Sequence, residues 1–230
     1  MPARAVVLPG TSLLVPGAGG GADRLGDVRA AVAHALDRLV AESATQPVTP
    51  ATTGRDGDAP LVVLAPAPRG AGGGFGRRRP SLAGAGVADR WVPDVAAWSG
   101  EGPAAHVPAS VALLSLHAAL RRAGHDGPPG VVVLEVSDAA EPPAEAVVAL
   151  RRAPAVVVAG GAAPGTPGAA AVPDPVPDRG SGPPVLLAPS VSALLDAAVA
   201  PGRWSWRVTT VPGGHEHLPP TYGVAEGVAG

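Results

Sequence analysis

The feature that most constrains the fold of this chain is a series of short β-branched segments separated by segments with helical spacing. The strand-like segments are Arg4 to Leu8, Leu61 to Ala65, Val131 to Val136, Ala155 to Ala159, Val185 to Leu187 and Ser205 to Val211. The helix-like segments are Asp23 to Glu42, Pro108 to Ala123, Ala144 to Arg152 and Ser190 to Ala200. This alternation predicts an α/β fold, with a mostly parallel central sheet and helices on both of its faces.

The length of the chain indicates a single domain. A chain of 230 residues lies within the range of one α/β domain. The segment from Gly160 to Pro184 consists mostly of Gly, Pro and Ala, and it is far longer than a usual connection between elements. We therefore expect residues 1–230 to form one domain with a mobile excursion at 160–184.

The composition argues against nucleic acid and membranes as partners. The formal net charge is -2, so there is no excess of positive charge to neutralise a phosphate backbone. No apolar run approaches the roughly 20 residues that span a bilayer, and the run after Arg4 is too short for a secretory signal. The chain has no Cys, which excludes disulfides and thiolate sites and fits a reducing compartment. These features predict a cytoplasmic protein.

Two polar residues occupy positions where α/β proteins place functional groups, and they are the candidate catalytic residues. Glu135 interrupts the apolar run from Val131 to Val136, near the carboxyl end of a predicted strand, where open α/β sheets bind ligands. A buried carboxylate needs a partner, so Glu135 either serves such a site or pairs with an Arg across the rim of the sheet. His106 directly precedes a predicted helix, whose positive end favours a neutral imidazole that can act as a base.

Three further motifs have competing interpretations. His215 and His217 flank Glu216 on a loop and are candidate metal ligands, but both reach one ion only if the backbone turns between them. The alternative for them is a solvated loop. Arg77 to Arg79 either bind an anionic ligand or partner or form a solvated basic loop. The glycines from Gly17 to Gly21 do not directly follow the first strand, so they do not match a dinucleotide fingerprint and no cofactor-binding residue is predicted.

Four short segments, spread over both halves of the chain, carry a family resemblance. They are Ala5 to Pro16 (AVVLPGTSLLVP), Leu61 to Pro66 (LVVLAP), Ser81 to Val87 (SLAGAGV) followed by Val107 to Ser110 (VPAS), and Pro220 to Val224 (PTYGV). In this order they resemble the B-subunit family of class III extradiol ring-cleavage dioxygenases, in particular its actinobacterial branch. The resemblance implies an α/β fold of the kind that the strand pattern predicts.

The resemblance also implies where a metal site would lie. Active members of that family hold Fe(II), or another divalent metal, through histidines and a carboxylate or third histidine near strand ends, and a further His transfers protons. The first two ligand positions fall on Gly10 and Ala67, the proton-transferring position falls near Pro103, and a later His position falls around Pro164. None of these side chains ligates a metal ion or transfers a proton, and His106 lies three residues beyond the expected catalytic position. The resemblance therefore implies a dioxygenase-like scaffold that has lost its metal ligands.

Two hypotheses follow. The first is a non-catalytic or repurposed domain of this kind, a pseudoenzyme that binds a small molecule or a protein partner without a cofactor. The alternative is a metal-dependent class III extradiol dioxygenase or related oxidoreductase with a rearranged site. That site would hold Fe(II) or another divalent metal with residues drawn from His106, Glu135, His215 and His217. Because closed two-fold dimers are the commonest assemblies, the expected oligomer is a homodimer.

Overall fold

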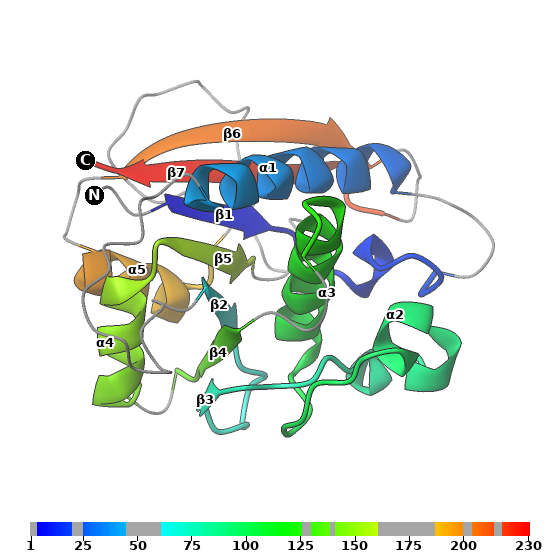
Figure 1. Cartoon of the computed structure of the whole chain (residues 1–230), viewed down its shortest axis with the longest axis horizontal. Coiled ribbons are helices and arrows are strands. Elements are labelled where there is room, and N and C mark those ends of the chain that lie inside the picture. Colours follow the sequence, from blue (N-terminus) through cyan, green and yellow to red (C-terminus); the bar gives the residue numbers. More distant parts are fainter. Residues whose placement is uncertain are drawn as a thin grey trace.

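The fold is a seven-stranded sheet covered by helices (Figure 1). The computed structural model describes residues 4–19, 25–44, 61–125, 130–138, 141–160, 187–199, 204–213 and 218–230. The strands are β1 (Arg4–Leu8), β2 (Leu61–Pro66), β3 (Gly74–Gly76), β4 (Val131–Val136), β5 (Ala155–Ala159), β6 (Trp204–Pro212) and β7 (Thr221–Ala229). The α-helices are α1 (Gly26–Ala44), α2 (Pro93–Ala96), α3 (Val107–Arg122), α4 (Ala144–Arg152) and α5 (Pro189–Val199). Single 3₁₀ turns lie at Ser12–Leu14, Ala83–Ala85 and Asp89–Trp91.

The sheet is parallel in its centre and antiparallel at both edges. Its strand order is β3-β4-β2-β5-β1-β7-β6. The four central strands β4, β2, β5 and β1 run parallel, whereas β3, β7 and β6 each run antiparallel to their neighbours. The predicted α/β class is confirmed, but the expectation of a mostly parallel sheet holds only for the centre. A short connection joins β6 to β7, and such a connection produces an antiparallel hairpin.

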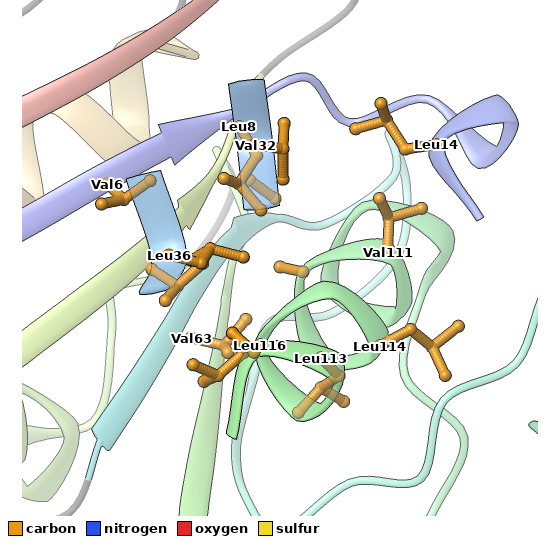
Figure 2. Close-up of a cluster of buried hydrophobic side chains, with 14 of the residues drawn as sticks. Val6, Leu8, Leu14, Val32, Leu36, Val63, Val111, Leu113, Leu114 and Leu116 are labelled. Atoms are coloured by element: carbon orange, nitrogen blue, oxygen red, sulfur yellow. The ribbon is translucent and has the colours of Figure 1, made fainter. Parts of the chain in front are cut away.

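Alternate residues of the strands point into two cores, one on each face of the sheet. On one face, α1 and α3 pack against the sheet, and Figure 2 shows this core: Val6, Leu8, Val32, Leu36, Val63, Val111, Leu113 and Leu116. On the other face, Leu150 of α4 and Leu195 of α5 pack against Val7, Val62 and Val156 of the strands. Burial on both sides explains why the central strands are nearly continuous runs of Val and Leu. Helices on both faces are confirmed.

Local sequence signals explain the boundaries of α3. His106 is its N-cap residue in an extended conformation, and Pro108 occupies the first turn, where no backbone N–H is needed. Arg121 and Arg122 lie in the last turn, where positive charge is favourable. Gly124 follows with a φ of 84°, a left-handed conformation that glycine adopts without strain. The N-terminus of α3 lies at the carboxyl ends of the parallel strands, because the N–H of His106 donates to the carboxylate of Glu135 near the end of β4.

Most predicted elements match the structure to within a few residues, and the two strands that were missed are rich in glycine. β3 is Gly-Phe-Gly, and β7 contains Gly223 and Gly227. Gly227 lies under the ring of Trp206, because a Cβ there would come 2.6 Å from a ring carbon. Leu187 lies in a bend and not in the predicted strand, and Val185 lies outside the described residues.

The expected mobile excursion, 160–184, lies outside the described residues except for Gly160. Gly160 is buried, and its N–H donates to the carbonyl oxygen of Leu8 at 2.6 Å, which extends the β1–β5 ladder by one residue. In the described part of the chain, no helix combines the length and apolar character needed to cross a membrane.

Candidate functional site

The carboxyl ends of the four parallel strands meet the N-terminus of α3. Pro108, in the first turn of α3, lies beside Gly10 after β1, and Gly160 after β5 lies against the same glycine. The N–H of Ala67, just after β2, donates to the carbonyl oxygen of Val136 in β4 at 2.7 Å. Open α/β sheets bind ligands at this edge, so it is the candidate functional site.

Glu135 is buried at this edge, with 3% of its surface exposed. Alternate residues of a strand point to the same face of the sheet, so Glu135 points to the same face as Val131 and Val133. These two valines lie in the core under α1 and α3, and the side chain of Glu135 therefore faces the same layer. Its Oε1 accepts a hydrogen bond from the backbone N–H of His106 at 2.6 Å. Its Oε2 lies 3.9 Å from Nε of Arg78. A carboxylate next to the first backbone N–H groups of a helix is stabilised by the helix dipole, so this position suits a buried acid.

Arg78 forms an ion pair with Glu135 across the rim of the sheet. Such a pair was one of the two alternatives predicted for Glu135, the other being a ligand site. The Arg78 side chain is 18% exposed, and its buried Nε makes no hydrogen bond within the described residues. Its guanidinium lies against the backbone of Gly74, where a Cβ would clash with Nη2. The expectation of a solvated basic loop at Arg77 to Arg79 is therefore wrong for Arg78. Arg77 is exposed, and Arg79 lies 3.6 Å from the carboxylate of Asp89.

A second polar network, which the sequence analysis did not identify, holds the segment before α3. The Asp89 carboxylate accepts from the hydroxyl of Ser81 at 2.9 and 3.0 Å and from the N–H of Leu82 at 2.9 Å. The Ser81 N–H donates to Ser110 Oγ at 2.9 Å, and the Ser110 hydroxyl donates to the carbonyl oxygen of Ala105 at 3.1 Å. The only signal in the sequence was two serines in otherwise apolar segments. The network joins Ser81 to Val87 with Val107 to Ser110, which together form the third segment of the family resemblance.

The structure brings together only part of the candidate residue set. His106 and Glu135 are joined, but the contact uses the backbone of His106. His215 and His217 lie outside the described residues. His34 and His125 are exposed, on α1 and after α3.

His117, on α3, is partly buried. Its ring meets Trp98 edge to face, with ring centroids 5.1 Å apart. Burial lowers the pKa of His117 below its ordinary value, and the nearby positive charge of Arg121 lowers this pKa further, while Asp94 opposes both. His117 therefore belongs to the packing of α2 against α3.

The residues at the positions that the family resemblance assigns to the metal site do not fit a divalent metal. A Cβ on Gly10 would lie 2.5 Å from the carbonyl oxygen of Gly160, so this position has no room for any side chain. Ala67 has only a methyl group, and Pro103 is exposed with its carbonyl oxygen bound to the N–H of Arg79 at 3.1 Å. Pro164 lies outside the described residues. Among the residues that the structure describes, no group of three or more His, Asp or Glu could hold a metal ion.

Comparisons of the chain with protein-family models, with curated proteins and with solved structures found no match. The family resemblance therefore stays a prediction that rests on the four segments.

Proposed function

We propose that this chain is a non-catalytic or repurposed extradiol-dioxygenase-like domain that binds a small molecule or a protein partner. The observation that carries this proposal is the packing around Gly10. The carbonyl oxygen of Gly160 occupies the space that a side chain at position 10 would need, and Pro108 closes the other side at contact distance. Because the resemblance places the first metal ligand at this position, a ligand there would require the end of β5 to move.

The contacts of Glu135 support the same proposal. Glu135 is the one acidic residue among the buried residues that the structure describes. Its two oxygens already face the N–H of His106 and the guanidinium of Arg78. A metal bound by Glu135 would have to compete with both, because the carboxylate would have to give up its hydrogen bond to His106 and its ion pair with Arg78. We therefore assign Glu135 to holding the strand ends and α3 in place.

The ligand or partner of this domain is expected at the same edge, because the described strand ends and the α3 N-terminus converge there. The absence of Cys from the sequence fits a role in the cytoplasm.

Reconstitution with Fe(II) under anaerobic conditions tests the proposal. We expect far less than one iron per chain by elemental analysis, and no ring-opened product when catechols and oxygen are added. A variant with His215→Ala and His217→Ala serves as the control, and its residual iron should equal that of the wild type. Near-stoichiometric iron in the wild type that is lost in this variant would overturn the proposal in favour of the rearranged metal site.

A further inference from the structure

β6 forms one edge of the sheet and is long and regular. It pairs with β7 over nine consecutive residues, from Trp204 opposite Ala229 to Pro212 opposite Thr221, with no bulge in the register. Among the described strands, β7 is its only neighbour, and Figure 1 shows β6 as the outermost strand, beyond β7. Its other side therefore presents a row of backbone N–H and C=O groups that no described strand pairs with.

This edge lacks most features that keep edge strands from pairing. Proteins usually protect a free edge with charges, prolines or bulges. β6 has one charged residue, Arg207, and its proline is its last residue, Pro212. Its middle consists of Val208, Thr209 and Thr210, which are exposed β-branched residues with a strong preference for strands. Val208 is 48% exposed, one of the few large apolar side chains that are exposed in the described part of the chain.

We propose that β6 pairs antiparallel with β6 of a second copy of this chain, about a two-fold axis at Val208. Val208 is the middle residue of β6, so this register aligns all nine residues of both strands. It places Val208 opposite its own counterpart and covers that exposed side chain. Directly opposite residues of an antiparallel pair lie on the same face, so the sheet continues from one copy into the other.

The one charged residue of the edge is not placed directly opposite a like charge in this register. Arg207 comes opposite Thr209 of the second copy, and the two copies of Arg207 lie diagonally across the axis, about 7–8 Å apart. On β7, the residue opposite Arg207 is Glu226, which already pairs with Arg38 of α1. Because one pair of strands adds only modest cross-strand contacts, we expect a dimer that dissociates on dilution.

Cysteine cross-linking tests the register directly, because the chain contains no Cys. Val208→Cys should be cross-linked into a dimer by a short bifunctional thiol reagent, since directly opposite Cβ atoms in a strand pair lie about 4.5–5.5 Å apart. Val148→Cys is the matched control, because Val148 is 45% exposed but lies on α4. Equal cross-linking of both variants, or a wild type that sediments as a monomer up to about millimolar concentration, would overturn the proposal.

Charge variants at the same position provide a second test. Val208→Lys and Val208→Glu should each weaken the dimer by about tenfold or more, because like charges then face each other across the axis. An equimolar mixture of the two should dimerise again, because Lys then faces Glu. Circular dichroism checks that both variants fold. A dimer that is unchanged in Val208→Lys excludes this interface, whatever the result of the iron experiment.

Discussion

The carboxylate of Glu135 accepts a hydrogen bond of 2.6 Å from the backbone N–H of His106, which ties the end of β4 to the start of α3. Both residues were candidate catalytic groups in the sequence, and they do meet. Their contact, however, uses the carboxylate of one residue and the main chain of the other. Such a contact fixes an element boundary, because it satisfies a donor that the helix itself leaves unpaired.

Replacing Glu135 should destabilise the fold strongly. In Glu135→Ala, the N–H of His106 loses its acceptor, and the guanidinium of Arg78 loses its ion pair with the carboxylate. We expect a loss of about 2–4 kcal/mol in the free energy of unfolding, measured by urea denaturation. Glu141→Ala, at an exposed position outside the sheet, is the control and should change stability by less than about 0.5 kcal/mol.

Glu135→Gln separates the two contacts of Glu135. The amide oxygen still accepts from His106, but the negative charge next to Arg78 is gone. We expect a smaller loss than in Glu135→Ala, and the additional change Arg78→Met should recover part of it. A Glu135→Ala variant as stable as the wild type would show that the tie between β4 and α3 contributes little.

A methyl group at Gly10 should also be costly. In Gly10→Ala the Cβ would approach the Gly160 carbonyl oxygen to 2.5 Å, so the ends of β1 and β5 would have to separate. We expect a loss of about 1–3 kcal/mol from this overpacking. Gly72→Ala is the matched control, because a Cβ there meets nothing within 4 Å. Equal stability of the two variants would remove the steric argument against a ligand at position 10.

Truncation of the core should show that the α1–α3 face is tightly packed. Leu116 is fully buried between α3 and the sheet (Figure 2). Leu116→Ala should lower the free energy of unfolding by about 2–5 kcal/mol, the usual cost of truncating a buried leucine to alanine. Val148→Ala removes apolar atoms from an exposed site on α4 and should cost less than about 0.5 kcal/mol. The two denaturation midpoints in urea provide the comparison.

The central strands and the helices could be predicted because their signal is local. Val131 to Val136 and Ala155 to Ala159 are β-branched runs, and the observed strands have these same bounds. β3 and β7 could not be found in this way, because glycine contributes no local preference for strands. At Gly227 the reason for glycine is a tertiary contact, the ring of Trp206 on the neighbouring strand, which the order of residues in the sequence does not reveal.

The sequence indicated where the candidate site lies, but not which contacts its residues make. Glu135 lies near the end of an apolar strand, and both alternatives for it, a ligand site or a pair with an Arg, assumed a buried side chain. The side chain is buried. Its partners, Arg78 and the N–H of His106, come from segments far away in the sequence and meet only in the fold. The network of Ser81, Asp89 and Ser110 was missed for the same reason.

The stability of the fold should depend on the protonation of His117. Burial, together with the charge of Arg121, lowers the pKa of His117 below 6.5, although Asp94 has the opposite effect. Just below pH 6.5 the unfolded chain therefore binds more protons at this residue than the folded chain does. Linkage then requires that stability falls as the pH drops from about 6.5 through the lowered pKa, and that this residue has no further effect above that window.

Urea denaturation at pH 5.5 and pH 7.5 measures this dependence. His117→Gln should lose part of the difference between the two pH values, because its side chain does not titrate. His34→Gln, at an exposed position on α1, is the control and should keep the wild-type difference. If His117→Gln keeps the full difference, the edge-to-face contact with Trp98 tolerates a charged imidazole, and the packing of α2 against α3 does not depend on a neutral His117.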